Sequence, residues 1–172
     1  MANNVMTVTG PISPGDMGLT LPHEHVMVDF IGADKVGKHR YQPDDVVSTM
    51  LPYVREAQEQ GVRTFVDCTP MYLGRDVEVL RTISELTGLQ ILTNTGQYKE
   101  PHLPAETLEI EAEALADRWI REFEEGIDGT SIKPGFIKTA VERERLASMQ
   151  QKVARAAVLT SRATGTSIVE AL

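Results

Sequence analysis

The chain has 172 residues, enough for one domain with a hydrophobic core, and 41% of them are hydrophobic. Its 17 lysines and arginines are outnumbered by 25 aspartates and glutamates, and the net charge of −8 argues against nucleic-acid or anionic-membrane partners. The single cysteine excludes an internal disulfide, and the first residues lack the pattern of a signal peptide. We therefore expect a soluble, cytoplasmic protein that acts on small molecules.

Helical and extended patterns alternate along the chain. A short strand or hairpin, interrupted by prolines and glycines, is expected at residues 5–18. The patterns then predict extended segments at 19–30, 62–70, 89–96, 135–140 and 167–172, and helices at about 44–60, 75–87, 104–125 and 142–164. Short, nearly all-apolar strands that alternate with helices are typical of a parallel sheet buried on both faces. A doubly wound sheet and a (β/α) barrel both fit, and either would place its chemistry at the C-terminal ends of the strands.

Two of the four histidines stand one residue apart in the segment TLPHEHVMVDF, residues 20–30. Because side chains alternate along a strand, His23 and His25 should share one face, while Glu24 points to the other. Two neighbouring imidazoles on a rigid strand can bind one transition-metal ion. The alternative is that each is a polar residue at a strand end, hydrogen-bonded to the backbone.

A lysine interrupts the short apolar segment GFIKTA. Phe136, Lys138 and Ala140 are expected to share one face of this strand. The residue pattern alone favours a lysine that extends from the strand end into solvent, because lone lysines usually keep their charge in water.

The segment GPISPGDMGLTLPHEHVMVDF, residues 10–30, resembles the opening of the phosphotriesterase family of the amidohydrolase superfamily, which includes phosphotriesterases and lactonases. The segments FVDCTP, GRDVEVLRTISELTG, TNTGQY, GFIKTA and ATGTSIV match that family in order and approximate spacing. Between the doubly wound sheet and the (β/α) barrel, this resemblance favours the barrel. It implies an α/β fold in which residues 1–172 form the N-terminal part of a TIM (β/α)8 barrel, with about four and a half βα units and no second domain.

The resemblance also implies a site. Family members carry two divalent metal ions, usually zinc, at the C-terminal mouth of the barrel. His23 and His25 match the ligands of one ion, and Lys138 matches a lysine that reacts with carbon dioxide to form a carbamate bridging both ions. That reaction needs a neutral amine, which burial near cations supplies by lowering the lysine pKa. Lys133, in the loop before this strand, is the less favoured candidate.

Tyr98 follows the glycine of TNTGQY. It matches a tyrosine that faces the substrate in lactonase-like members of the family. The alternative is an aromatic residue at the rim that packs on a loop.

The other polar residues are expected to have structural roles. Asp67, at the end of the second long strand, is interpreted as a partner for loop backbone rather than as a group that orients a ligand histidine. Residues 75–76 should open a helix. We expect His39 and His102 to be solvated, and Cys68 to be a small buried hydrophobic residue.

Part of the family pattern is missing. A complete (β/α)8 barrel needs about 250 residues. The family's next ligand is a histidine expected near Ala171, where the sequence has none, and the later histidine and aspartate ligands have no counterpart. The sequence therefore predicts a fragment, a truncated gene product or an incompletely recorded sequence, with open sheet edges. Without the missing half of the barrel, some inward-facing strand side chains would be exposed. The candidates include Phe65, Ile91, Phe136 and Ile168, and the strand register decides which of them point inward.

The predicted function is metal-dependent hydrolysis of an ester bond, in a lactone or phosphotriester, by a binuclear centre and an activated water molecule. The chain alone should be weakly active or inactive, without nucleic-acid or membrane partners, and it could form a homo-oligomer through its open edges. The main alternative is a non-catalytic remnant with weak or no metal binding. A metal-free α/β binding module is a third possibility.

Overall fold

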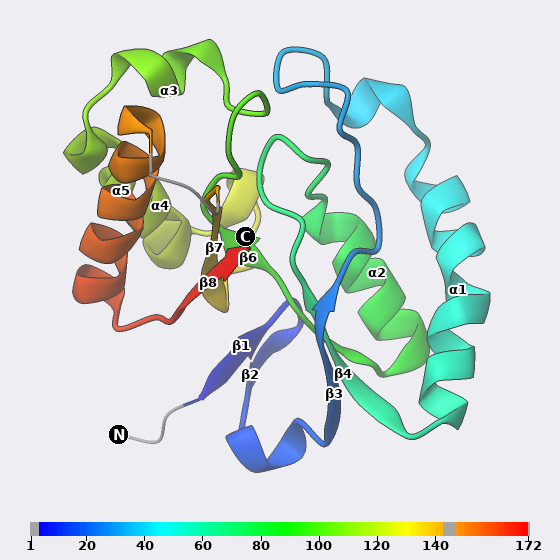
Figure 1. Ribbon diagram of the computed structural model, residues 1–172. Coiled ribbons are helices and arrows are strands. Elements are labelled where there is room, and N and C mark those ends of the chain that lie inside the picture. The colour runs from blue at the N-terminus through cyan, green and yellow to red at the C-terminus, as the bar shows by residue number, and fades with distance from the viewer. Residues whose placement is uncertain (1–3, 143–146, 172) are drawn as a thin grey trace.

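The computed structural model describes residues 4–142 and 147–171 and shows helices alternating with mostly parallel strands (Figure 1). The strands are β1 (Val5–Thr7), β2 (Gly10–Ile12), β3 (Leu19–Glu24), β4 (Val62–Asp67), β5 (Gln90–Leu92), β6 (Asn94–Thr95), β7 (Phe136–Ala140) and β8 (Ile168–Ala171). The α-helices are α1 (Pro43–Glu59), α2 (Val77–Thr87), α3 (Ala105–Glu109), α4 (Ala112–Glu125) and α5 (Ser148–Thr164). Three short 3-10 turns cover Pro14–Asp16, Lys38–Arg40 and Ile127–Gly129.

The parallel strands form an α/β partial TIM barrel, as the family resemblance implies, and not the doubly wound sheet that the residue patterns also allowed. One sheet has the order β3-β4-β5 and the other the order β6-β7-β8, all parallel. The predicted strand at 89–96 is divided into β5 and β6 at Thr93, whose carbonyl accepts a hydrogen bond from the Gly135 amide. In Figure 1, α1 and α2 lie beside β3 and β4, and α4 and α5 lie beside β7 and β8, so the helices are outside a curved sheet.

The first long strand is shorter than predicted. It ends at Glu24 rather than at Phe30, and its register against β4 shifts between Leu21 and Glu24. Pro22 lies in this interval and has no amide to donate to the ladder. His25 therefore lies one residue beyond β3, at the start of the loop that leads to α1.

Two helices differ from their predicted bounds by more than two residues. The helix predicted over residues 104–125 is divided into α3 and α4, because Ile110 and Glu111 have extended backbones with ψ of 155° and 161°. The helix predicted from residue 142 begins at Ser148, after the extended Ala147. Residues 143–146 of that prediction lie outside the described part of the chain.

Helix α2 begins at Val77, two residues after its predicted start, and Asp76 is its N-terminal cap. The Asp76 carboxylate accepts hydrogen bonds from the amides of Glu78 and Val79, and α2 ends at Gly88 with a φ of 73°. A carboxylate at a helix N-terminus satisfies amides that have no partner within the helix. The predicted structural role of Asp76 is confirmed.

The inner strand faces are better covered than predicted. Phe65, Ile91 and Phe136 are buried, and of the four strand residues only Ile168 is exposed, at 38%. Phe65 and Ile91 belong to the core cluster that includes buried valines of α1 and α2. Phe136 belongs to a smaller cluster against which Val5 of the β1–β2 hairpin packs. The β1–β2 hairpin thus covers apolar surface that the sequence predicts to be exposed.

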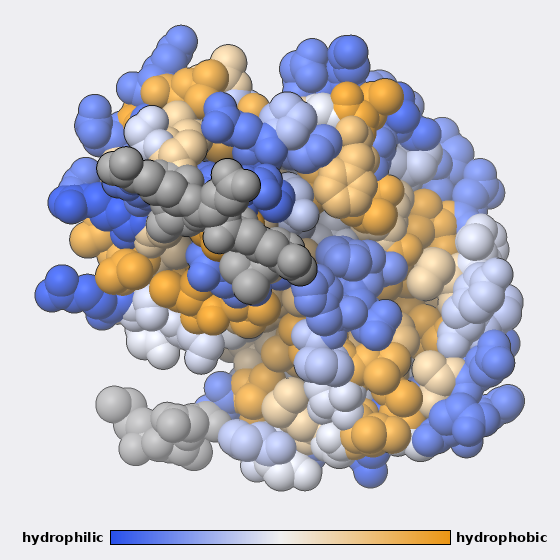
Figure 2. Space-filling view, in the orientation of Figure 1, coloured by the Kyte–Doolittle hydropathy of each residue, from blue (hydrophilic) through white to orange (hydrophobic). Residues whose placement is uncertain are grey.

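The outer edges of the curved sheet are unpaired within residues 4–142 and 147–171. There, β3 pairs only with β4, and β8 pairs only with β7. Leu19 of β3 and Ile168 of β8 are among the large hydrophobic side chains that reach the surface. Figure 2 shows such hydrophobic surface interleaved with hydrophilic residues on one face. No helix in the described part of the chain is long and apolar enough to cross a membrane.

Candidate metal centre

The structure brings the two predicted histidines together at the C-terminal end of β3. The rings of His23 and His25 have centroids 5.3 Å apart and planes inclined by 60°. Both side chains are exposed, so both rings are accessible to an ion from solvent. Two imidazoles at this spacing suit the binding of one metal ion.

The segment that follows β4 contacts one histidine of this pair, His25. His25 Nδ1 lies 2.9 Å from Thr69 Oγ1, and the Thr69 hydroxyl donates a hydrogen bond to the Met27 carbonyl. Sequence reasoning missed Thr69. Its position directly after a strand that ends beside β3 was the available signal, because the C-terminal ends of neighbouring parallel strands lie close together.

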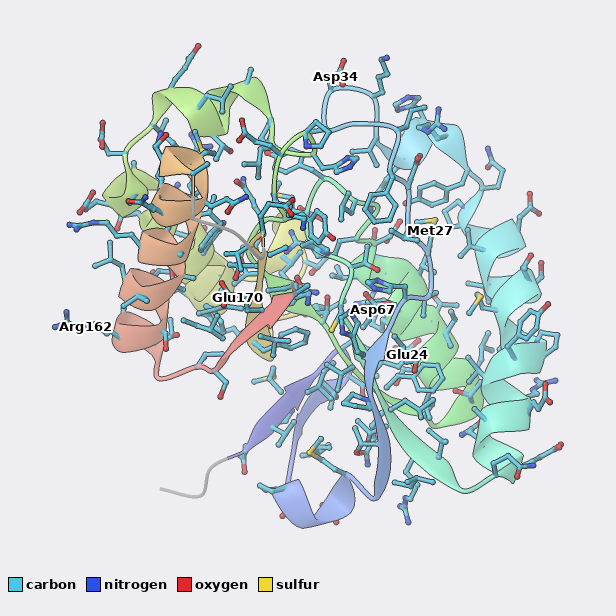
Figure 3. All side chains as sticks on the ribbon, viewed as in Figure 1. Glu24, Met27, Asp34, Asp67, Arg162 and Glu170 are labelled. Carbon is cyan, nitrogen blue, oxygen red and sulfur yellow. The ribbon has the colours of Figure 1, made fainter. Side chains whose placement is uncertain are left out.

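Asp67 stabilises the backbone on both sides of this contact. Its carboxylate accepts hydrogen bonds from the amides of Val26, at 2.8 Å, and Thr69, at 3.0 Å. Asp67 is the register partner of Glu24, and the two labelled side chains lie at the ends of β4 and β3 in Figure 3. The interpretation of Asp67 as a partner for loop backbone is confirmed.

Lys138 lies in the middle of β7 and is 1% exposed. The expectation from the residue pattern alone, a lysine reaching into solvent, is therefore wrong. Its Nζ is buried and has no hydrogen-bond partner in the described part of the chain. Burial lowers the pKa of Lys138. A buried amine without a partner is costly, and it is the kind of group that a reaction or a ligand would satisfy.

The histidines and Lys138 influence one another electrostatically. Burial lowers the pKa of His23, and the positive charge of Lys138 lowers it further. Burial, His23 and Lys138, in that order, lower the pKa of His25. All three groups are thus biased towards their neutral forms, which are the forms that bind metals or react with carbon dioxide.

The residues present fit a metal centre only in part. Within residues 4–142 and 147–171, no group of three or more His, Cys, Asp or Glu side chains is arranged to hold a metal ion. The two adjacent imidazoles and the unpartnered buried amine of Lys138 fit the predicted ligands. A carbamate on Lys138 would add the oxygen donors that the described residues do not supply.

Tyr98 lies in an aromatic cluster with Phe30 and His102. The Phe30 ring is 5.9 Å from the Tyr98 ring and 5.0 Å from the His102 ring, in edge-to-face geometry. The expectation that His102 is solvated is wrong, because its ring is half-buried against Phe30 and its Nδ1 is buried without a partner in the described residues. His39 is exposed, as expected. The cluster joins two loops that are far apart in sequence, so the sequence pattern did not reveal it.

Cys68 is fully buried, as predicted, and burial raises the pKa of its thiol to about 11. Because only the thiolate is nucleophilic, we expect a thiol-reactive dye at pH 8 to label the native chain at least about 100-fold more slowly than the chain unfolded in denaturant. The chain has one cysteine, so the absorbance change reports this site alone. Complete labelling of the native chain at the unfolded rate would contradict the buried position.

The stability of the chain should depend on the ionisation of Asp67. Burial raises its pKa to about 6, although hydrogen bonds from Val26 and Thr69 oppose the shift. Between pH 4 and 6 the folded state binds more protons at Asp67 than the unfolded state does. This contribution to stability is therefore largest at about pH 4 and falls by about 3 kcal/mol as the pH rises to 7.

Urea unfolding of the unchanged chain and of Asp67→Asn at several pH values measures this contribution. Subtracting the two curves removes the effect of carboxylates that titrate in both proteins. The free energy of unfolding of the unchanged chain should fall relative to that of Asp67→Asn between pH 4 and 7. A constant difference would show that the pKa of Asp67 is not raised in the fold.

Comparisons with known proteins agree on one family. The phosphotriesterase family matches residues 3–171. An aryldialkylphosphatase of Saccharolobus solfataricus is 34% identical over 92% of this chain and 50% of its own length. An N-acetyltaurine hydrolase of Rattus norvegicus is 29% identical over 80% of this chain and 47% of its own length. The solved organophosphorus hydrolase of Deinococcus radiodurans superposes with a TM-score of 0.87 at 33% identity, covering 98% of this chain and 53% of that one. The chain thus spans about half the length of the relatives that it matches.

Proposed function

The chain belongs to the phosphotriesterase family, and we propose that it is the N-terminal barrel part, as one domain, of a metal-dependent hydrolase of ester bonds. The proposed substrate is a small molecule, a lactone or a phosphotriester. The names of the relatives support hydrolysis but differ in substrate, since one is an aryldialkylphosphatase and another an N-acetyltaurine hydrolase. The proposal therefore rests on the residues of the site. Assays with a lactone and with a phosphotriester would distinguish the two substrate classes.

The observation that carries the proposal is the buried Lys138 amine, which has no hydrogen-bond partner within the described residues. A structural lysine would be expected to reach water or an acidic partner. An amine that is buried and biased towards its neutral form is suited to carbamate formation. Its electrostatic influence on His23 and His25 supports a common site.

We assign each residue one role. His23 and His25 would hold one divalent ion, most simply zinc, through ring nitrogens, and Lys138 as a carbamate would hold that ion and a second one. When bound, the ions would polarise the carbonyl or phosphoryl oxygen of the substrate and lower the pKa of a water molecule. Tyr98, with Phe30 beside it, would contact the substrate at the rim.

Carbamate formation can be tested directly. The full chain is incubated with zinc and 13C-labelled bicarbonate, and carbon NMR is used to look for a carbamate signal. We expect one such signal in the unchanged chain and none in Lys138→Met. Lys133→Met is the matched control, because Lys133 lies five residues earlier in a loop, and it should keep the signal.

The alternative is a non-catalytic remnant with weak or no metal binding. It predicts no carbamate signal and no zinc retained after dialysis, in the unchanged chain as in Lys138→Met. Under our proposal, zinc retention falls in His23→Ala and in Lys138→Met. Because the sequence contains only three of the expected ligands, we expect little turnover of a lactone or an aryl dialkyl phosphate by this chain alone, even with zinc and bicarbonate.

Self-association through the unpaired edges of β3 and β8 is also part of the proposal. Each edge exposes backbone groups and a large hydrophobic side chain, Leu19 or Ile168. Such edges favour pairing with another copy of the same chain. Size-exclusion chromatography should show a species larger than a monomer, and a monomer at all concentrations would exclude this element of the proposal.

A further inference from the structure

The contact between Thr69 and His25 has a direction that the surrounding hydrogen bonds determine. Thr69 is 1% exposed, and its Oγ1 lies 2.9 Å from His25 Nδ1 and 3.0 Å from the Met27 carbonyl oxygen. A hydroxyl has one proton to donate, although its oxygen can also accept. A carbonyl oxygen can only accept, so the proton of Thr69 belongs to the bond with Met27. The bond with His25 must then be donated by the imidazole.

We propose that Thr69 is a positioning residue that holds His25 as the Nδ1–H tautomer and leaves the Nε2 lone pair free for a metal ion. The opposite tautomer would place a proton on Nε2 and would take the Thr69 proton away from the Met27 carbonyl. The inference rests on the proposed function, because it assigns a purpose to one ligand of that site. It adds a residue from the end of β4 to the predicted ligands on β3 and β7.

The surroundings of Thr69 are built to keep its hydroxyl in place. Its amide donates to the Asp67 carboxylate, at 3.0 Å, and its carbonyl accepts a hydrogen bond from the Asn94 side chain, at 3.1 Å. The backbone of Thr69 is thus fixed from β4 on one side and from β6 on the other. A threonine fixed in this way can set both the tautomer and the orientation of the His25 ring.

Metal-binding histidines commonly donate their second ring N–H to an oxygen, and the loss of such a partner typically lowers metal affinity by roughly 10–100-fold. The Thr69 hydroxyl would be that oxygen acceptor for His25. The Thr69→Val substitution keeps the shape of the side chain and removes the acceptor. The Thr69→Ser substitution keeps the hydroxyl and removes only a methyl group.

The experiment reads the tautomer without metal. The full chain, labelled with 15N-histidine and freed of metal, is studied by long-range proton–nitrogen correlation NMR at pH 8, with His25 assigned by its loss in His25→Gln. We expect His25 to be Nδ1–H in the unchanged chain and in Thr69→Ser. Thr69→Val should show Nε2–H or a mixture of both forms. An Nε2–H form in the unchanged chain would overturn the inference, as would an unchanged tautomer in Thr69→Val.

A second measurement distinguishes the positioning role of Thr69 from the proposed metal site itself. Zinc affinity, measured by competition with a chromophoric chelator, should fall roughly 10–100-fold in Thr69→Val and stay near that of the unchanged chain in Thr69→Ser. If the tautomer pattern holds but none of the proteins binds zinc, the proposed metal site fails while the role of Thr69 in orienting His25 stands. If zinc binds with equal affinity to all three, Thr69 does not act on the ligand. Should Thr69→Val not fold, the spectrum of the unchanged chain still decides the tautomer.

Discussion

The Gly96→Ala variant is expected to lose about 3–5 kcal/mol of its free energy of unfolding, combining the cost of an overpacked contact with the cost of a strained backbone. Gly96 has a φ of 108°, a conformation that residues with a Cβ rarely adopt. A Cβ at this position would lie 2.1 Å from the Lys138 carbonyl oxygen and 3.0 Å from its carbonyl carbon and amide nitrogen. Those are backbone atoms of β7, so no side chain can rotate away.

The Gly96→Ala substitution should also alter the candidate site, because the new contact can be relieved only if β7 moves away from the segment that follows β6. Lys138 would be displaced with its strand, and the loop that carries Tyr98 would shift. We therefore expect Gly96→Ala to lose the carbamate signal as well as stability. The absence of a side chain at this glycine of TNTGQY allows the two segments to touch.

Gly61→Ala is the matched control. Gly61 has a φ of 91°, but a Cβ there would have no atom within 4 Å. It should therefore suffer only the backbone strain, about 1–3 kcal/mol. Urea unfolding of both variants and of the unchanged chain gives the difference due to the contact. Equal losses in the two variants would show that the contact with Lys138 contributes nothing.

Local sequence patterns predicted which helices and strands exist more accurately than they predicted the residues at which these elements begin and end. The helix at 43–59 begins at a proline followed by two aspartates, and that at 77–87 has an aspartate cap and a terminal glycine, so local chemistry determines both. The break at Ile110 and Glu111 has no such local signal. Ile110 packs against the core cluster formed by residues of α4, α5 and β7, and a local pattern does not contain such tertiary contacts.

The candidate site could likewise be predicted only where local patterns or the family resemblance identified its residues. Strand alternation and family resemblance identified His23, His25 and Lys138 without any structure. The resemblance implied the burial of Lys138, whereas the strand pattern alone pointed to solvent, because burial depends on which other strands surround β7. Thr69 was missed because its role depends on a contact with a residue 44 positions away. Short sequence patterns do not identify such pairs, and only the rule that neighbouring parallel strands bring their C-terminal ends together pointed to this region.

The largest effect from a single ion pair is expected at Arg75, whose predicted structural role the structure confirms. Its side chain is 1% exposed, and its guanidinium donates two hydrogen bonds to the Glu122 carboxylate, at 2.9 Å and 2.7 Å. It also donates to the Asn94 carbonyl at 2.8 Å. Burial disfavours the charge, but Glu122 and Asp128 outweigh it and raise the pKa of Arg75, so the group stays charged.

Arg75 therefore joins parts of the fold that have separate cores. It lies in the loop between β4 and α2, whereas Glu122 belongs to α4 and Asn94 to β6. The residues of α2 pack in one hydrophobic cluster and those of α4 in another. Asn94 in turn donates to the Thr69 carbonyl. Loss of Arg75 should loosen the attachment of α4 to the loop before α2, and should weaken the support that Asn94 gives to Thr69.

The Arg75→Ala variant should lose about 3–5 kcal/mol, because removing one partner of a buried ion pair leaves the other charge uncompensated. That is a large share of the about 5–15 kcal/mol that stabilises a typical domain. Urea unfolding of Arg75→Ala, Glu122→Ala and the double variant measures the coupling. The double variant should lose less than the sum of the single losses by about 1–3 kcal/mol, because the second removal breaks a pair that no longer exists. Strictly additive losses would mean that the guanidinium and the carboxylate do not stabilise each other, and Arg75 would then act through its contacts with the Asn94 carbonyl and the Asp128 carboxylate.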